Sequence, residues 1–362
     1  MRPFKEIIRD ESLAHLAKLL QEKKIMTLGK QLSSLSLKER MLLVSENLPT
    51  SLSKDDLLKI MVPLAHLQET KDLFSLNEKG LQGFLLWPLG LYVEKNFKTK
   101  EKLRDAFFLL EEITKRFTSE FFIRSFMDDF PLETKKRLFM WATSNNHHLR
   151  RLASEGSRPF LPWGKKLKED TFSFQESIHL LKILSQDSSL YVQKSVCNHL
   201  NDLSRLSPQN LMKAIPSLNL SEIQKRKALR SLIKKGDSSA LQLVGIKKDK
   251  SCSLESWSFT PRHLQLNETL FFHASLKNKQ HKEQKIIIHL VFSFLQQNNQ
   301  WGKNKIFKVR ELILAPLEER PLTFSWTMKE VTTRKYYPGK QKIALQFNGE
   351  MSEIKFFSFS KK

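Results

Sequence analysis

Cysteine is scarce in this sequence. Cys197 and Cys252 are the only two in 362 residues, and they lie far apart in the chain. They cannot form a disulfide framework, and they lack the CxxC spacing of a zinc site. We therefore expect a reducing, cytoplasmic compartment.

Motifs for cofactors and common hydrolases are absent as well. The chain has no Walker motif, no GxGxxG, no HExxH and no GxSxG. Its ten histidines are scattered, apart from His147-His148, which have no Cys or Asp partners at ligand spacing. The sequence thus predicts no metal and no cofactor.

Long apolar runs are missing too. The longest extends from Phe84 to Val93, which is too short to cross a bilayer and contains Pro88 and Gly90. The N-terminal residues lack the apolar segment of a signal peptide. We expect no membrane-spanning segment and no membrane partner that would require one.

The chain has an excess of positive charge. Its 61 Lys and Arg against 38 Asp and Glu give a formal net charge of +23. This excess favours a polyanionic partner: DNA, RNA or an anionic membrane surface. With 40% hydrophobic residues, the chain can still build a packed core.

The first part of the chain has helical periodicity. Apolar residues follow helix spacing in two stretches, which are Leu103, Phe107, Leu110, Ile113 and Phe117, and Val192, Val196, Leu200 and Leu203. We predict that residues 1–247 form a mainly α solenoid of stacked helix pairs, whose concave face would hold a duplex.

The last part alternates with the period of strands. Leu322, Phe324, Trp326 and Met328 alternate with polar residues. Ile286, Ile288, Leu290, Phe292 and Phe294 also stand at every second position, on a longer run. Ile343, Leu345 and Phe347 precede Asn348-Gly349, a hairpin-type turn before Ile354 and Phe356. We predict an all-β, immunoglobulin-like sandwich over residues 252–362, after a basic linker at 246–251.

Charged residues gather in three stretches. On a helix, Arg151, Glu155 and Arg158 would share one face, where two arginines hold a carboxylate ionised or grip phosphates. Pro159 and Pro162 would end this helix and present Trp163. The plainer interpretation is a helix salt bridge followed by a tryptophan in the core.

The other two stretches are also open to two interpretations. Lys194, Asn198 and Asp202 follow each other by one helical turn, opposite the Val192 stripe, either as a site or as an ordinary solvated face. His199 is expected to be a structural hydrogen bonder. Glu120 stands in apolar surroundings one turn before Arg124, as a functional acid or as half of a helix pair.

Four segments resemble the AlkC family of bacterial DNA-alkylation-repair glycosylases. They are FTSEFFIRSF around Glu120, RRLASEGSRPFLPW from Arg150 to Trp163, NHLNDLS from Asn198 to Ser204, and ALRSLIKKGDSSALQLVGI from Ala228 to Ile246. They occur in the family's order between about Leu35 and Ile246. The β segment resembles the long form of the family, which has a C-terminal immunoglobulin-like domain.

The resemblance implies that the solenoid is a HEAT-like helical-repeat fold, and it implies a function. It implies hydrolysis of the N-glycosidic bond of cationic alkylated bases in duplex DNA, such as N3-methyladenine, N3-methylcytosine and N1-methyladenine, without base flipping. By motif, Glu120, Glu155 and Asp202 match the active-site acids and Trp163 the aromatic that contacts the sugar. We predict DNA contacts by Arg124, Arg150, Arg151, Arg158, Lys194 and Asn198.

The sequence departs from the family pattern at several positions. Phe160 and Gln193 stand where basic residues are usual, Phe121 where a small residue is usual, and Ser125 where proline is usual. These changes affect DNA contacts, not the acids or Trp163.

The resemblance implies a monomeric, monofunctional glycosylase that initiates base excision repair at the bacterial nucleoid. The alternative is a non-catalytic DNA-binding helical-repeat scaffold, and a protein–protein adaptor ranks last because of the charge. Acids placed among phosphate-seeking arginines favour the enzyme, since a scaffold gains nothing from acids that repel its ligand.

Overall fold

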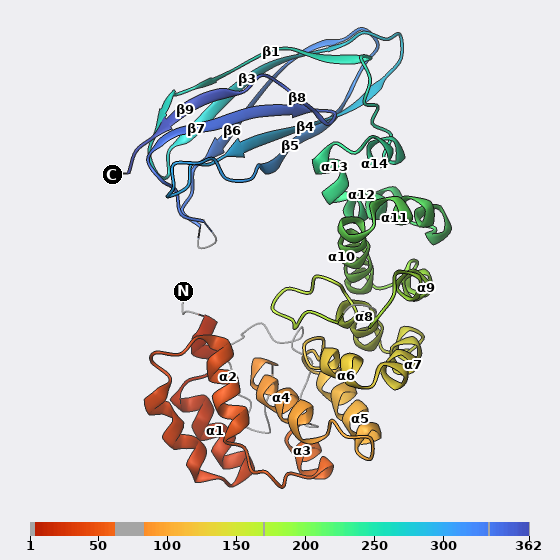
Figure 1. Cartoon of the computed structure of the whole chain (residues 1–362), viewed down its shortest axis with the longest axis vertical. Coiled ribbons are helices and arrows are strands. Elements are labelled where there is room, and N and C mark those ends of the chain that lie inside the picture. Colours follow the sequence, from red (N-terminus) through yellow and green to blue (C-terminus); the bar gives the residue numbers. More distant parts are fainter. Residues whose placement is uncertain (1–3, 62–82, 169–170, 332–333, 362) are drawn as a thin grey trace. The chain divides into compact units, whose positions relative to one another are not determined.

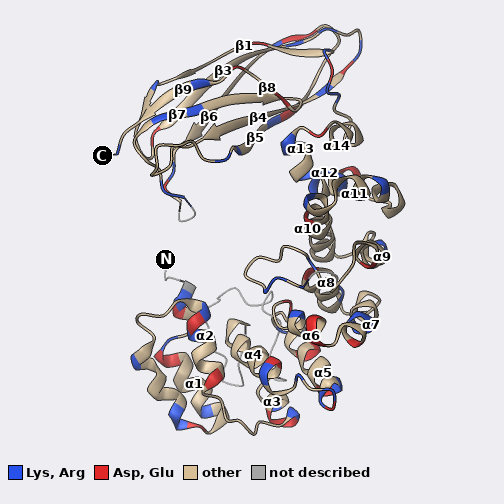
Figure 2. Cartoon of the chain, viewed as in Figure 1, with Lys and Arg blue, Asp and Glu red and all other residues tan. Residues whose placement is uncertain are grey.

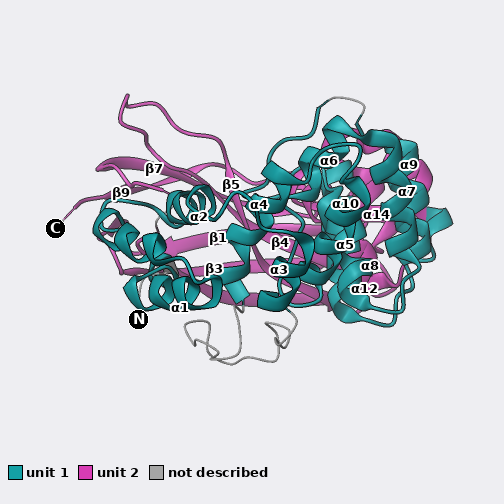
Figure 3. Cartoon of the chain, turned by 90° about the horizontal axis from the view of Figure 1, so that it is seen from below, with its two compact units in different colours: residues 1–203, 216–219 teal, residues 204–215, 220–362 magenta. Residues whose placement is uncertain are grey.

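The computed structural model describes residues 4–61, 83–168, 171–331 and 334–361. Its helices precede its strands along the chain (Figure 1). Lysines and arginines recur along both helices and strands (Figure 2). The chain divides into two compact units, Met1–Leu203 with Pro216–Asn219, and Ser204–Ile215 with Leu220–Lys362 (Figure 3). The predicted fold class, a helical solenoid followed by a β-sandwich, is confirmed.

The first unit is a stack of helices. They are α1 (Asp10–Leu20), α2 (Leu37–Glu46), α3 (Lys54–Met61), α4 (Trp87–Asn96), α5 (Leu103–Thr114), α6 (Ile123–Asp129), α7 (Pro131–Ala142), α8 (His147–Gly156), α9 (Phe174–Leu184) and most of α10 (Leu190–Leu206). Helix α2 packs on α4, α3 on α5, and both α5 and α7 on α8. Packing between near neighbours in the chain is typical of helical repeats. Among the described residues, no helix is both long enough and apolar enough to span a membrane.

The predicted apolar stripes form the contacts between these helices. On α10, the four predicted stripe residues are at most 2% exposed: Val192, Val196, Leu200 and Leu203. On α5, the stripe residues Leu103, Phe107, Leu110 and Ile113 are buried. Phe117 is buried as well, but it lies beyond the end of α5, so the predicted helix was too long. Gly90 on α4 permits close packing, since a Cβ there would lie 2.0 Å from the ring of Phe122.

The second unit contains short helices and two sheets. The helices are α11 (Pro208–Ala214), α12 (Glu222–Ala228), α13 (Arg230–Lys235) and α14 (Ser238–Leu243). One sheet has the order β1 (Cys252–Thr260), β3 (Thr269–Asn278), β6 (Glu319–Thr327). The other has the order β2 (His263–Leu264), β9 (Lys355–Phe359), β7 (Gly339–Phe347), β4 (Gln284–Ser293), β5 (Lys305–Leu314), with β8 (Glu350–Met351) beside β7.

An aromatic core joins the two sheets. Phe292 of β4 is fully buried, and its ring centroid lies 4.3 Å from that of Trp326 on β6. The predicted turn at Asn348-Gly349 connects β7 to β8, with φ of 46° and 85°. Ile354 and Phe356, predicted to follow it in the core, are instead 54% and 42% exposed. Phe357 and Phe359 take the core positions, because β8 intervenes and shifts the pattern by one residue.

The short helices of the second unit contact part of the larger sheet. Side chains on both faces of β4 are buried, so Ile287 and Val291 are as inaccessible as Ile288 and Phe292. Arg226 of α12 forms an ion pair with Glu311 of β5. This packing explains why the last helices form one compact unit with the strands.

The predicted linker at 246–251 is held against the sheet. Ile246 is fully buried and bridges to Lys285 of β4, while Asn348 Nδ2 donates to the carbonyl of Lys247. The compact units divide the chain within α10, earlier than residue 247, where helices give way to strands. The domain boundary between residues 247 and 252 stays a prediction.

Replacing Phe292 by alanine is expected to destabilise the sandwich by about 3–5 kcal/mol, because the cavity removes ring contacts with both sheets. Urea denaturation measures the change in the free energy of unfolding. Phe271→Ala, on the exposed side of β3 (55% exposed), is the control and is expected to cost less than about 1 kcal/mol. Equal losses of stability in the two variants would contradict the core assignment.

Candidate active site

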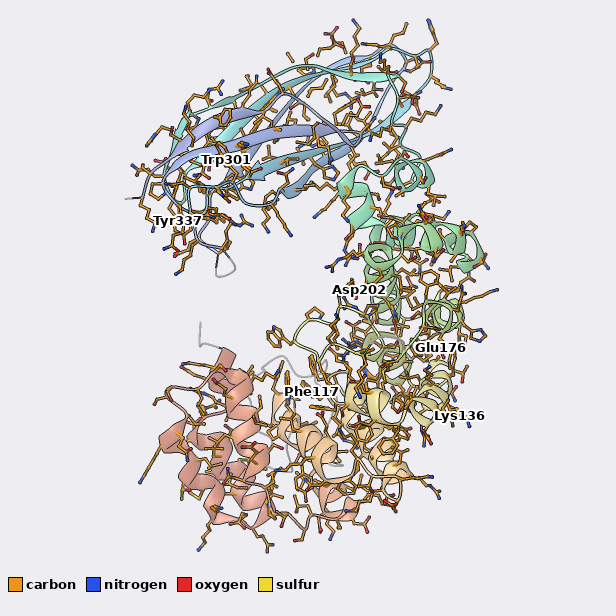
Figure 4. The ribbon with its side chains drawn as sticks, in the orientation of Figure 1. Phe117, Lys136, Glu176, Asp202, Trp301 and Tyr337 are labelled. Carbon is orange, nitrogen blue, oxygen red and sulfur yellow. The ribbon has the colours of Figure 1, made fainter. Side chains whose placement is uncertain are left out.

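Three predicted acids and two predicted arginines meet between α8, α10 and the turn that precedes α6. In spatial order they are Glu120, Arg151, Glu155, Arg158 and Asp202, so each arginine stands between two acids. We call this set the charge chain. Asp202 lies on α10 beside the stacked helices of the first unit (Figure 4). Three carboxylates against two guanidinium groups leave one net negative charge.

The C-terminal half of the charge chain has the tighter geometry. Arg158 Nε donates to Asp202 Oδ2 at 2.9 Å, and Nη2 donates to Oδ1 at 3.3 Å. Arg158 Nη1 donates to Glu155 Oε1. One guanidinium therefore fixes two carboxylates from different helices.

Arg151 connects the other half. Its Nη1 donates to Glu120 Oε2 and to Thr118 Oγ1 (3.0 Å), and Nη2 lies 3.9 Å from Glu155 Oε1. The guanidinium also lies over the ring of Tyr191, 5.1 Å from its centroid. These contacts leave Arg151 little freedom to turn towards solvent.

Burial makes this pairing necessary. Glu120, Glu155 and Asp202 are 7%, 6% and 2% exposed. Burial works to lower the pKa of Arg151 and of Arg158, but the neighbouring carboxylates outweigh it and the pKa of each guanidinium is raised. Both arginines are thus charged, and they keep the acids oriented and compensated.

Arg158 reaches the site by a different route from the predicted one. Helix α8 ends at Gly156, so Arg158 does not share a helical face with Arg151. Its position is set by Arg124, whose Nη1 donates to the carbonyls of Gly156 and Arg158 at 2.8 Å. A cation at a helix C-terminus satisfies carbonyls that have no partner within the helix.

Arg124 is therefore not a phosphate ligand in this structure, which corrects that prediction. It is 0% exposed, and its Nε donates to the carbonyl of Lys165. Burial lowers its pKa to about 10. The predicted helix pair with Glu120 is also absent, because Glu120 lies in the turn before α6 and pairs with Arg151.

Arg150 is likewise bound within the protein. Its Nη2 donates to Asp187 Oδ1 at 2.9 Å, and Nη1 donates to the carbonyls of Ser144 and Asn145. In place of the predicted DNA contact, Arg150 forms an ion pair with Asp187 that ties α8 to a neighbouring segment. Arg158, also predicted to contact DNA, instead forms ion pairs with Glu155 and Asp202.

The polar face of α10 that packs against α8 differs from the predicted polar face, which consisted of Lys194, Asn198 and Asp202. Ser195, His199 and Asp202 are buried and face α8, whereas Lys194 is exposed and Asn198 half-buried. Asp202 belongs to the buried face because its spacing from Ser195, seven residues, is two helical turns. Of the two interpretations of this helix, the ordinary solvated face is therefore wrong for Asp202, which is 2% exposed.

His199 is a structural hydrogen bonder, as expected. Its Nδ1 lies 3.0 Å from the carbonyl oxygen of Ser154. Burial lowers its pKa to about 3, so the imidazole is neutral at pH 7 and its Nδ1–H donates to that carbonyl.

Trp163 lies in the loop that follows α8 and is 66% exposed. This excludes the alternative of a tryptophan buried in the core. Its φ of 63° is strained for a bulky residue. With Trp87 and Met41 it lines a hollow of about 360 Å³. The loop thus presents a large aromatic face to solvent.

Three residues of the site escaped the sequence analysis. Thr118 donates to Glu120 Oε2 at 2.5 Å, Ser195 donates to Glu155 Oε2 at 2.6 Å, and Tyr191 lies under Arg151. The spacing of Ser195 and Asp202 was a usable signal. Thr118 and Tyr191 gave none, since only packing brings them to Arg151.

The departures from the family pattern have structural roles. Phe121 stacks on Trp87 with centroids 4.6 Å apart, and Gln193 Nε2 donates to the carbonyl of Asp187. Phe160 contributes its backbone N–H to Asp202 Oδ2 at 3.3 Å, which needs no particular side chain. Ser125 is buried and donates to the carbonyl of Phe122.

Within the described ranges, no group of three or more His, Cys, Asp or Glu residues is arranged to hold a metal ion. The chemistry available in the charge chain is that of carboxylates held beside guanidinium groups. Such a site can stabilise positive charge and accept a proton from water.

Arg158→Met is expected to lower the free energy of unfolding by about 3–5 kcal/mol at pH 7, since it leaves buried Asp202 without its counterion and Glu155 with only Arg151, 3.9 Å away. Urea denaturation measures this change. Lys225→Met, which breaks an exposed pair with Glu222, is the control and should cost at most about 1 kcal/mol. Equal costs in the two variants would contradict the role of Arg158 as the buried counterion.

Comparisons with known proteins agree with the motifs. Residues 253–361 match the model of the YhaZ C-terminal Ig-like domain. The uncharacterised YhaZ of Bacillus subtilis (strain 168) is 34% identical over 323 residues, covering 88% of this chain and 86% of YhaZ. The structure of Pseudomonas fluorescens alkylpurine DNA glycosylase AlkC, bound to DNA with an abasic-site analogue, matches with a TM-score of 0.84 and 29% identity, over 99% of this chain and 100% of that one. The chain belongs to the AlkC-type family, in the long form with a C-terminal immunoglobulin-like domain, together with YhaZ.

Proposed function

We propose that this protein is a DNA glycosylase that acts on alkylated DNA. The observation that carries the proposal is the buried charge chain, in which three acids alternate with two arginines and leave one net negative charge. The likeness to AlkC, whose structure holds DNA with an abasic-site analogue, supports it. We further propose that the protein is a monomer that initiates base excision repair in the bacterial cytoplasm.

The substrates we propose are cationic bases in duplex DNA, such as N3-methyladenine, N3-methylcytosine and N1-methyladenine. An alkylated base with a positive charge is a good leaving group and needs no protonation. The demand then falls on the sugar, where oxocarbenium-like charge develops at C1′. Carboxylates near that carbon stabilise the charge, and the face of Trp163 adds cation–π attraction.

The reaction is proposed to be monofunctional. The charged partners of Glu120 and Glu155 are arginines, which cannot form a Schiff base. The product is then an intact abasic site without strand cleavage. We also propose that the base stays in the stack, which avoids the unpairing cost of base flipping and restricts the enzyme to labile, cationic lesions.

Replacing the acids is the direct test of catalysis. Glu155→Gln and Asp202→Asn are each expected to slow base release from N-methylated duplex DNA by roughly 10²-fold or more, since each removes charge stabilisation from the transition state. Single-turnover release of the base measures the rate. Glu112→Gln on α5, a buried acid paired with Lys115 and Arg116, is the control for removal of a carboxylate elsewhere.

The same assay separates the enzyme from the alternative, a non-catalytic scaffold. Release of no base from any methylated substrate, with DNA binding intact, favours the scaffold. Full activity of both acid variants leaves a glycosylase but rejects the site.

DNA binding needs cations that are not already paired. We propose that exposed Lys194 and half-buried Asn198 contact DNA near the site. In the second unit, Lys303, Lys305 and Lys335 are exposed and line a hollow of about 860 Å³ with Tyr337. Trp301, at the same end of the sandwich as Tyr337 (Figure 4), is 43% exposed with Lys342 Nζ 3.8 Å from its ring centroid. We propose that this basic, aromatic end of the sandwich clamps DNA.

Surface substitution tests the clamp better than truncation, because removing the sandwich would expose the helix faces packed on it. Changing Lys303, Lys305 and Lys335 to alanine together is expected to reduce the slope of log K against log salt by about 0.9 for each phosphate that is no longer neutralised. Fluorescence anisotropy with duplex DNA at several salt concentrations measures the slope. The control changes Lys277, Lys279 and Lys308, which are already paired with acids. Equal slopes in the two triple variants would refute the clamp.

A further inference from the structure

The three acids of the charge chain differ in how their oxygens are engaged. Both oxygens of Glu155 accept hydrogen bonds, Oε1 from Arg158 and Oε2 from Ser195. The hydroxyl of Ser195 also lies 3.0 Å from that of Ser154. Glu155 is therefore held from both sides by groups that are themselves buried.

Asp202 is equally occupied. Its Oδ2 accepts from Arg158 Nε and from the N–H of Phe160, and its Oδ1 accepts from Arg158 Nη2. Each oxygen of Asp202 therefore already accepts a hydrogen bond, and two of the three bonds come from the charged guanidinium of Arg158.

Glu120 is engaged on one side. Thr118 Oγ1 and Arg151 Nη1 both donate to Oε2, and no described residue donates to Oε1. Its side chain keeps 10% exposure, against 8% for Glu155 and 3% for Asp202. Oε1 of Glu120 is thus the carboxylate oxygen of the charge chain to which no described residue donates, so it is the one most open to a water molecule.

We propose that Glu120 activates the hydrolytic water and that Thr118 is its positioning residue. This inference rests on the proposed glycosylase function and assigns roles within the same site. The water oxygen bonds to C1′ while the N-glycosidic bond breaks, and the bonding electron pair leaves with the base and cancels its positive charge. The proton of the water passes to Glu120 Oε1 and then to solvent.

The geometry of Thr118 supports this role. Its hydroxyl donates its single proton to Glu120 and accepts from Arg151 Nη1 at 3.0 Å, so it sits inside the ion pair of these two residues. Both donors hold Oε2 and leave Oε1 without a donor among the described residues. Glu155 and Asp202 then supply negative charge beneath the sugar without exchanging protons.

The experiment measures single-turnover base release from N-methylated duplex DNA in H2O and in D2O, and binding of duplex with an abasic-site analogue. Glu120→Gln is expected to slow release by about 10²–10⁴-fold and to leave binding within a few-fold. The wild type and Glu155→Gln are expected to release base more slowly in D2O, because a proton moves from water. Glu120→Gln is expected to lose that dependence.

Thr118 is tested by two variants of different chemistry. Thr118→Val keeps the shape without the hydroxyl and is expected to slow release by roughly 10- to 100-fold with unchanged binding. Thr118→Ser restores the hydroxyl and is expected to recover most of that rate. Equal rates in the two variants would overturn the positioning role, since shape alone would then explain the residue.

The outcomes also separate this inference from the function. Wild-type release with no effect of Glu120→Gln, or with the same D2O dependence in that variant, overturns Glu120 as the base and leaves a glycosylase. Absence of release in the wild type itself rejects the proposed function, and this inference with it.

Discussion

The structure of the first unit depends on neutralising buried carboxylates with buried arginines. Glu155 and Asp202 come from different helices, and Arg158 is bonded to both. Such an arrangement adds little net stability, since desolvation offsets most of the attraction, but removing one member is costly. The alternation therefore fixes α8 against α10 and keeps three acids together, as a site for a cationic transition state requires.

Positively charged side chains have two tasks in this protein, pairing with buried acids and, as we propose, contacting DNA phosphates, and different residues serve each task. The arginines of the motif, Arg150, Arg151 and Arg158, are engaged by acids, and Arg124 holds backbone carbonyls. The phosphate contacts that we propose are therefore assigned to exposed lysines. The net charge of +23 is thus a property of the surface, whereas the site has a negative charge.

Periodicity predicted much of the fold but misplaced one side chain. The stripes on α5 and α10 and the alternation in β4 and β6 report burial directly, since a core-facing residue must be apolar. The prediction that Lys194 and Asp202 share one face of α10 was wrong, because a sequence pattern does not distinguish a buried polar face from a solvated one. Whether a polar face is buried depends on what packs against it, here α8.

The amino-acid sequence by itself determined the order of helices and strands, the sandwich core and the identity of the acids, because these follow from local spacing and from motifs. Only the tertiary structure decided how the charges pair. Glu120 and Arg151 are 31 residues apart, and Arg158 and Asp202 are 44 apart. Ion pairing depends on distance in space and on burial, which no local pattern encodes. That packing also leaves Glu120 Oε1 without a donor among the described residues.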